Sequence, residues 1–201
     1  MNAEEIIASE EFAKCRSFHG HICPGLALGF VAGKSALKWI KERRAVDEEV
    51  VAIVENDSCF VDAIQVLTGC TFGKGNLIYK DYGKMAFTLL SRKAGTGVRL
   101  SLRPDAFAPD ERHAALRQKI VQGEADEQER KLFQELHYQR TCQVLGTPGE
   151  KLFRFTEAKG GVPQKARIAP SQPCALCGEP TMESKLVELD AKRVCRACAG
   201  Q

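Results

Sequence analysis

Apolar residues recur at helical spacing in the first part of the chain and give way to short β-branched runs in the middle. The spacing predicts a short helix over residues 3–15 and a longer one from Pro24 to about Arg44. Proline at the first helical position has no N–H to leave unbonded there, so Cys23 is expected to cap the longer helix. The apolar positions of that helix recur at steps of four and three residues: Leu26, Phe30, Gly33, Leu37 and Ile40.

The middle of the chain has the pattern of strands separated by glycine turns. Val50–Val54 is a β-branched run that predicts a buried strand. It leads into a helix expected over residues 59–69, with Asp57 or Ser58 as its cap. Three further strands are expected after this helix, at residues 76–79, 86–92 and 98–102, with turns at 81–83 and 94–97.

Two consecutive helices are expected next, over residues 104–123 and 126–146. Acidic residues stand early in each, and Gly123 and Gly146 fall where C-terminal caps belong. Apolar periodicity then fades between Thr156 and Gln172, where Gly, Pro and Ser are frequent. The sequence therefore predicts three parts: a core domain over residues 1–155, a linker or arm over 156–172, and a small domain over 173–201.

Composition and charge narrow the classes of protein. With 201 residues and 44% hydrophobic composition, the chain can bury a real core. The formal net charge is only +3, from 29 basic and 26 acidic residues, which by itself favours neither nucleic acid nor an acidic surface as partner. The N-terminus has no apolar core of signal-peptide length, and no segment approaches the roughly 20 apolar residues that span a bilayer. We therefore expect a soluble, cytoplasmic protein without membrane contact.

Nine cysteines are the most prominent feature of the composition. In a chain without a secretion signal they indicate metal ligands or reactive thiols before disulfides. Four of them form two C-x-x-C pairs, Cys174 with Cys177 and Cys195 with Cys198, separated by the 17 residues 178–194. This spacing is typical of a closed, structural four-cysteine zinc site, and so small a segment is expected to need its metal to fold. A rubredoxin-like iron site uses similar ligands, so the identity of the metal stays open.

The residues around these four cysteines do not favour nucleic acid. From residue 160 on, six basic residues stand against four acidic ones, and no aromatic side chain is available to stack on a base. Contact with a protein partner through the finger is therefore preferred, with nucleic-acid binding as the alternative.

A second group of metal-ligating and nucleophilic residues lies in the first third of the chain. His19 and His21 flank Gly20 and, in an extended segment, would point the same way. Cys59, Asp62 and Gln65 follow at steps of three and share one face of the expected helix. Cys59 stands at the N-terminus of that helix, where the partial positive charge of the first turn stabilises a thiolate.

Two chemical interpretations of this group stay open. In one, His19 or His21 forms a second transition-metal site in the core together with Cys59. In the other, Cys59 is the nucleophile or redox thiol of an enzyme, His19 or His21 is the base, and Asp62 orients that base. Against both stands the ordinary role of free cysteines as small buried side chains.

Several motifs together resemble the FmdE family, named for the FmdE component of formylmethanofuran dehydrogenase. They occur in the family's order and cover roughly residues 10–150: Phe18 to Leu26, Glu55 to Gln65, Thr68 to Thr71, Gly73 to Leu77 and Asp81 to Lys84. The resemblance implies an α+β core with a small, mainly antiparallel sheet packed with helices. Some members carry a C-terminal treble-clef zinc finger and form intertwined dimers, which implies a homodimer here.

The resemblance also marks a pocket in the core. Its residues would be the candidate catalytic group His19, His21, Cys59 and Asp62, and the candidate ligand-binding group Cys23, Gln65, Cys70 and Lys74. The dehydrogenase reaction itself is not implied, because in that complex the one-carbon chemistry belongs to other components, which carry the molybdenum or tungsten pterin.

Three functions follow as hypotheses. The first is a metal-binding accessory or sensor protein, with a His/Cys pocket in the core and a structural zinc finger for partner contact. The alternatives are a thiol- or metal-dependent enzyme, and a nucleic-acid-binding regulator that acts through the finger. A core metal site predicts more than one ion per chain, whereas a nucleic-acid binder predicts affinity that falls steeply with salt.

Overall fold

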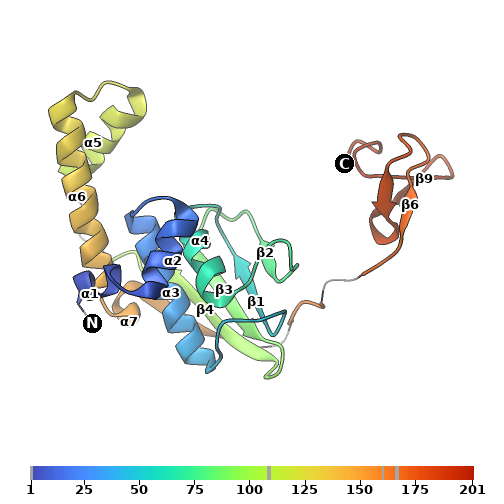
Figure 1. Cartoon of the computed structure of the whole chain (residues 1–201), viewed down its shortest axis with the longest axis horizontal. Coiled ribbons are helices and arrows are strands. Elements are labelled where there is room, and N and C mark those ends of the chain that lie inside the picture. The colour runs from blue at the N-terminus through green and yellow to red at the C-terminus, as the bar shows by residue number, and fades with distance from the viewer. Residues whose placement is uncertain (1, 108–109, 160, 166–167) are drawn as a thin grey trace. The chain divides into compact units, whose positions relative to one another are not determined.

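The computed structural model describes residues 2–107, 110–159, 161–165 and 168–201 of the chain (Figure 1). It divides into two compact units, Met1–Lys165 and Ala166–Gln201. Residues 160, 166 and 167, which belong to the expected linker, lie outside the described residues. Among the helices of the described residues, none combines the length and the apolar character needed to cross a bilayer.

The first unit is built on a five-stranded sheet with the strand order β2-β1-β3-β4-β5. Only the pair β1–β2 is parallel, and the pairs β1–β3, β3–β4 and β4–β5 are antiparallel. The expected α+β core with a mainly antiparallel sheet is therefore confirmed. The strands are β1 (Val50–Val54), β2 (Leu77–Tyr79), β3 (Ala86–Ser91), β4 (Thr96–Leu102) and β5 (Phe153–Lys159).

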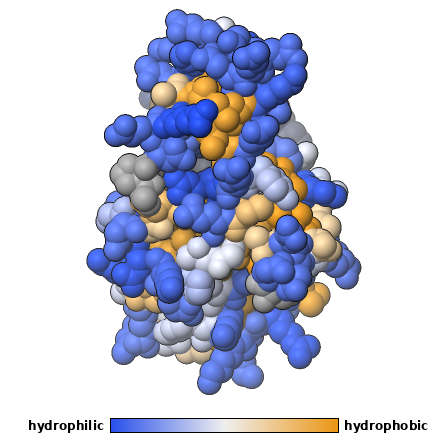
Figure 2. Space-filling model, turned by 90° about the vertical axis from the view of Figure 1, so that its left-hand side faces the viewer, coloured by the Kyte–Doolittle hydropathy of each residue, from blue (hydrophilic) through white to orange (hydrophobic). Residues whose placement is uncertain are grey.

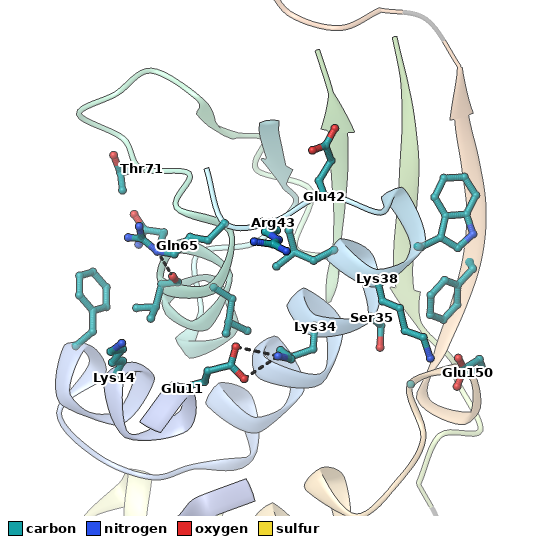
Figure 3. Close-up of a pocket in the computed structure, with 18 residues that line it drawn as sticks. Glu11, Lys14, Lys34, Ser35, Lys38, Glu42, Arg43, Gln65, Thr71 and Glu150 are labelled. Carbon is teal, nitrogen blue, oxygen red and sulfur yellow. Dashed lines mark hydrogen bonds and ion pairs between the residues drawn. The ribbon is translucent and has the colours of Figure 1, made fainter. Parts of the chain in front are cut away.

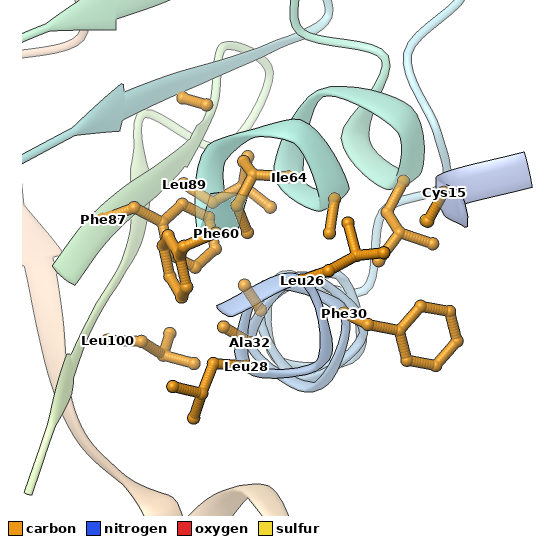
Figure 4. Packing of buried hydrophobic residues seen from close by; sticks show 14 of the residues in the cluster. Cys15, Leu26, Leu28, Phe30, Ala32, Phe60, Ile64, Phe87, Leu89 and Leu100 are labelled. Atoms are coloured by element: carbon orange, nitrogen blue, oxygen red, sulfur yellow. The ribbon is translucent and has the colours of Figure 1, made fainter. Parts of the chain in front are cut away.

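Two helices, α3 (Pro24–Ile40) and α4 (Cys59–Thr68), pack together against the sheet. They can approach closely because Gly29 has no side chain. A Cβ atom there would lie only 2.1 Å from the carbonyl oxygen of Phe60. Figure 4 shows apolar side chains of α3, α4 and the strands meeting in one core: Leu26, Leu28, Ala32, Phe60, Ile64, Phe87, Leu89 and Leu100.

The start of α3 confirms the expected cap. Cys23 has extended backbone dihedrals, Pro24 occupies the first turn, and the Cys23 Sγ accepts a hydrogen bond from the Leu26 N–H at 3.3 Å. The helix ends at Ile40 rather than near Arg44, because Lys41 takes a left-handed conformation with φ of 56°.

The helix expected over residues 3–15 is two helices, α1 (Ala3–Ile7) and α2 (Glu10–His19). Ser9 breaks the run, since its Oγ accepts a hydrogen bond from the Phe12 N–H and so caps α2. His19 is therefore the last residue of a helix and not part of an extended segment, and Gly20 ends that helix with φ of 98°.

A pair of helices, α5 (Glu111–Gln122) and α6 (Glu127–Leu145), forms an arm over residues 110–140 (Figure 1). Helix α6 lies where it was expected, with Asp126 as its N-cap and Gly146 as its C-cap. Helix α5 begins later than expected: residues 104–107 are not helical, and the side chain of Asp110 caps it. Residues 108 and 109 of the expected helix lie outside the described residues.

The arm has little core of its own. In α5 only Leu116 is buried. The last turns of α6 are buried at Thr141, Val144 and Leu145, where this helix packs on the rest of the first unit. Val121 is 77% exposed and Tyr138 is 49% exposed. Figure 2, which views the side that carries the arm, shows apolar surface among the charged side chains.

Two elements follow the arm that the sequence pattern did not indicate, α7 (Gly149–Leu152) and β5. Strand β5 runs to Lys159 and therefore into the range expected as a linker. Three of its seven residues are charged and exposed, Arg154, Glu157 and Lys159, while Phe153 is fully buried. Charged side chains on an edge strand are common because they oppose pairing with other chains, and here they hide the strand pattern.

The second unit consists of two small hairpins that carry the four cysteines. β6 (Ser171–Pro173) pairs with β7 (Pro180–Met182), and β8 (Val187–Leu189) pairs with β9 (Lys192–Val194). A 3₁₀ turn, η1 (Glu183–Lys185), precedes β8.

A partly buried ion pair joins Arg99 of β4 to Glu55, the residue that follows β1. The side chain of Glu55 is 8% exposed and accepts hydrogen bonds from Nε and Nη2 of Arg99 at 2.6 and 2.7 Å. Arg99 thereby holds the pKa of Glu55 below its ordinary value of 4.5. A Glu55→Gln variant is expected to lose about 2 kcal/mol of unfolding free energy at pH 7, measured by urea unfolding.

The pH dependence of that loss has a defined sign. Because the pKa of Glu55 is lower in the folded chain, its contribution is complete above pH 4.5 and disappears as the pH falls through the folded pKa. The wild type and Glu55→Gln should therefore converge in stability at acid pH. Glu157→Gln, an exposed change of the same type on β5, is the control. Its unfolding free energy should equal that of the wild type at pH 7 and at acid pH. A constant gap between Glu55→Gln and the wild type would contradict the prediction.

Candidate functional site

Three helix ends meet at one corner of the first unit. His19 is the last residue of α2, Cys23 caps the start of α3, and Cys59 is the first residue of α4. His21 lies in the short link between α2 and α3. One donor atom from each of these four side chains lies within 4.8 Å of the other three.

Glycine makes room for this convergence. A Cβ atom at Gly25 would lie 3.1 Å from the Cβ of Cys59 and 3.8 Å from the sulfur atoms of Cys23 and Cys59. The first turns of α3 and α4 can therefore approach until the two thiols face each other. On the other side, Gly20 reverses the chain after α2, so that the rings of His19 and His21 lie 4.3 Å apart between centroids.

A carboxylate fixes the orientation of His19. Its Nδ1 lies 2.7 Å from Oδ2 of Asp62, one turn along α4 from Cys59, and Gln65 in turn donates a hydrogen bond to Asp62 Oδ1 at 3.4 Å. The other ring nitrogen, Nε2, lies 3.8 Å from the sulfur of Cys23. Metal-ligating histidines are commonly held in this way, with one ring nitrogen on a carboxylate and the other free for the ion.

The two thiols differ in their surroundings. Cys23 is 4% exposed, and burial, reinforced by the neighbouring Cys59, raises its pKa to about 11, although the Leu26 N–H acts in the opposite direction. Such a thiol is protonated at neutral pH and is a poor nucleophile unless a cation replaces its proton. Cys59 is half-buried and His21 is exposed, so the cluster is open to solvent on one side.

The donor set suits a transition ion. Two imidazole nitrogens and two thiols are the ligands that zinc and other borderline-soft ions take, and four of them can complete a tetrahedral shell. The sequence placed a second metal site at Cys59 with His19 or His21, and the structure brings both histidines and Cys23 to the same point. The signal for the full set is the spacing His-x-His-x-Cys directly before a helix-starting proline.

Two sequence-predicted pocket residues lie elsewhere. Cys70 follows the far end of α4 from Cys59, is fully buried, and donates a hydrogen bond from its sulfur to the Val50 carbonyl at 3.5 Å. Burial raises its pKa. Lys74 donates from Nζ to the Val46 carbonyl at 3.4 Å, at the same end of α4. Of the eight expected residues, six therefore come together and these two do not.

The second unit carries a separate cluster. One sulfur atom from each of Cys174, Cys177, Cys195 and Cys198 lies within 4.8 Å of the others. Hydrogen bonds from the backbone N–H groups of Cys177, Cys195 and Leu176 lower the pKa of Cys174 to about 6. The N–H groups of Cys195 and Leu176 lie 3.2 and 3.5 Å from its sulfur. A set of four thiols of this kind fits a closed, structural zinc site, as the sequence indicates.

Two family models match the chain. The first is described as FmdE, molybdenum formylmethanofuran dehydrogenase operon, and covers residues 18–154. The second is described as the prokaryotic dksA/traR C4-type zinc finger and covers residues 167–201. The first match contains all four residues of the core cluster, and the second contains all four cysteines of the finger.

Two individual proteins are similar over most of the chain. A probable S-adenosyl-L-methionine-binding protein of Archaeoglobus fulgidus is 31% identical over 194 residues, which is 93% of this chain and 52% of that protein. The chain thus spans about half the length of this relative. The chain is also similar to a protein of known crystal structure, a tungsten formylmethanofuran dehydrogenase FmdE-like protein from Syntrophus aciditrophicus. The two sequences are 26% identical and the structures superpose with a TM-score of 0.64, and the match covers 98% of this chain and 92% of that one.

Proposed function

This chain belongs to the FmdE family, and on that premise we propose that it is a metal-binding accessory or sensor protein with a transition ion in its core. The proposed ligands are His19, His21, Cys23 and Cys59. The observation that carries the proposal is the convergence of their donor atoms within 4.8 Å at the ends of three helices. The hydrogen bond from His19 to Asp62 supports it, because it leaves the ring nitrogen Nε2 directed at the cluster.

An accessory or sensor role suits the position of the cluster. His21 is exposed, so a small ligand could replace it or approach the ion from solvent. The binding of S-adenosylmethionine named for the Archaeoglobus relative is not carried over, because nearly half of that protein lies outside the match.

For the second unit we propose a treble-clef-type finger that holds zinc and contacts a protein partner. Its support is the four-cysteine cluster together with exposed apolar side chains beside it, such as Leu176 at 55% exposure. We further propose a cytoplasmic homodimer. The exposed side chains of Val121 and Tyr138 on the arm support such an association.

Thiol chemistry is the second candidate for the core. The observation in its favour is that Asp62 orients the His19 ring, as the partner of a catalytic base would. The thiol that lies 3.8 Å from Nε2 is Cys23, however, and its raised pKa makes it a weak nucleophile. A metal ion uses the same geometry without this difficulty.

Metal content per chain tests the proposal. The full chain, purified without added metal, is expected to hold about two ions, one in each cluster. His21→Ala and Cys59→Ser should each hold about one ion, because the finger keeps its own. Cys142→Ser is the matched control, since Cys142 is a half-buried thiol on α6 outside both clusters, and it should keep both ions.

Either of two results would refute the core metal site. One is a wild-type chain that holds a single ion, lost with Cys195→Ser. The other is a second ion that survives both His21→Ala and Cys59→Ser. In those cases selective alkylation of Cys59 would be the next measurement, since the thiol interpretation would then be favoured.

Asp62 gives a finer prediction for the same centre. Asp62→Asn keeps the shape of the side chain but weakens its hold on the His19 ring, so the affinity of the core for its ion should fall by about 10- to 100-fold. Competition with a chromophoric chelator measures this affinity. Asp57→Asn, an exposed aspartate just before α4, is the control and should leave the affinity unchanged. Equal effects of the two changes would contradict a positioning role for Asp62.

A further inference from the structure

A groove of about 1270 Å³ lies on the first unit apart from the metal-ligating cluster (Figure 3). It is lined by residues of α2, α3, α4, α7 and β5, and none of the four proposed ligands is among them. Gln65 is the one residue that lines the groove and also belongs to the site described above. The groove is therefore a separate feature.

An ion pair crosses the groove and divides it. Lys34 on α3 donates to both carboxylate oxygens of Glu11 on α2, at 2.7 and 2.8 Å. In Figure 3 this pair lies between Gln65 and Thr71 at one end and Lys38 and Glu150 at the other. A long partner helix would have to pass over two paired charges, whereas a small molecule fits within one half. Volumes of several hundred Å³ are usual for small-molecule sites.

Most charges along the groove are already matched. Lys14 pairs with Glu10 at 2.8 Å, and Arg44 Nε donates to the Val66 carbonyl at 2.9 Å. Glu42 accepts from the hydroxyl of Ser91 at 2.7 Å.

Three charged groups of the groove are unmatched. Within the part of the chain that the structure describes, no hydrogen bond or ion pair involves the side chain of Lys38, Arg43 or Glu150. Two cations against one carboxylate leave a net positive charge, which suits an anionic ligand.

The groove also offers an aromatic surface beside Lys38. Trp39, which follows Lys38, is 41% exposed, and Phe155 of β5 lines the groove as well. An exposed indole can stack on a flat ring of a ligand.

Glu150 is held near this surface by close packing of α7 on α3. A Cβ atom at the preceding Gly149 would lie 2.3 Å from the hydroxyl oxygen of Ser35. The backbone at Glu150 is thus fixed at the end of the groove where Lys38 lies, and the carboxylate itself is exposed (Figure 3).

We propose that the groove binds a nucleotide along the part that runs from Arg43 to Lys38 and Glu150 (Figure 3). The base stacks on Trp39, the phosphates bind Lys38 and Arg43, and Glu150 accepts hydrogen bonds from the ribose hydroxyls. Each part rests on ordinary recognition chemistry: cations bind phosphate, and carboxylates bind ribose hydroxyls. An acidic peptide would use the two cations but would leave the indole and the carboxylate without partners.

Fluorescence provides a direct test, because Trp39 is the single tryptophan of the chain. ATP, without added magnesium, is titrated into the full-length protein, and the indole emission is followed. We expect a saturable change in emission. Lys38→Ala and Arg43→Ala should each weaken binding by about tenfold or more. Lys14→Ala is the matched control, since Lys14 lines the groove beyond the ion pair, and it should bind ATP as the wild type does.

Further ligands separate the contributions. Adenosine, which lacks phosphate, and tripolyphosphate, which lacks the base, should each bind at least about tenfold more weakly than ATP. Equilibrium dialysis of Trp39→Ala with ATP should show a similar loss, independent of fluorescence. Circular dichroism confirms that each variant is folded.

Three results would overturn the proposal. The first is no saturable change with ATP at millimolar concentration. The second is a loss of binding in Lys14→Ala equal to that in Lys38→Ala, which would indicate unspecific charge attraction. The third is binding of an oligoglutamate peptide as tight as that of ATP, which would identify the groove as a peptide site.

Discussion

A Cys195→Ser variant is expected to lose the ion of the finger and, with it, the fold of residues 168–201. Structural zinc contributes on the order of 10 kcal/mol or more to the folding of units of this size, and four thiolates are needed to complete its shell. The unit has few other sources of stability: Cys174 and Val194 are the buried apolar residues among its described positions. Proton NMR of the full chain should show the finger resonances collapse while those of the first unit persist.

Limited proteolysis gives an independent measure of the same change. Cleavage within residues 168–201 should become at least about tenfold faster in Cys195→Ser, since the backbone there is no longer protected. Cys142→Ser, with one thiol fewer but an intact finger, should be cleaved at the wild-type rate. A finger that keeps its resonances and its resistance in Cys195→Ser would show that the metal is not needed for its fold.

A Gly29→Ala variant is expected to destabilise the first unit by about 3 kcal/mol or more. The added Cβ would lie 2.1 Å from the Phe60 carbonyl oxygen and 3.0 Å from the Cβ of Ala63, so α3 and α4 would have to separate. The helix propensity of alanine, about 1 kcal/mol better than that of glycine, acts in the opposite direction and is too small to offset the clash. Urea unfolding of the full chain, followed by Trp39 emission, measures the difference.

The control for Gly29→Ala is Gly73→Ala. A Cβ atom at Gly73 would meet nothing within 4 Å, and the backbone there is not in the left-handed region. This change should alter the unfolding free energy by less than about 0.5 kcal/mol. If Gly29→Ala behaved like Gly73→Ala, the close contact between α3 and α4 would not be a determinant of stability.

The sequence predicted the parts of the fold whose signals are local. The cap at Cys23 followed from the proline after it, and β1 followed from a run of β-branched residues. The finger followed from cysteine spacing, because two C-x-x-C pairs must each bend around one ion. Strand β5 was missed, since its charged residues mask the alternation and its partner β4 lies some fifty residues earlier.

The site shows a similar limit. Helical spacing placed Cys59, Asp62 and Gln65 on one face, and the structure brings them to His19 as that spacing implies. Spacing alone could not show whether the segment after α4, which contains Cys70, folds back to the Cys59 end of the helix. Gly69 turns the chain with φ of 71° at the far end, against the Ala45 carbonyl, and so takes Cys70 away from the cluster. The missing information was tertiary.

The register of β4 and β5 bears on how this family can vary. The chain leaves β4 at Leu102 and returns to β5 at Phe153, and these two residues are direct partners in the sheet. The ends of the intervening excursion are thus already side by side, and the entropy of closing a loop grows only with the logarithm of its length. Insertions, deletions or whole foreign segments between residues 110 and 140 should therefore accumulate during evolution, or be engineered, with little penalty to the sheet.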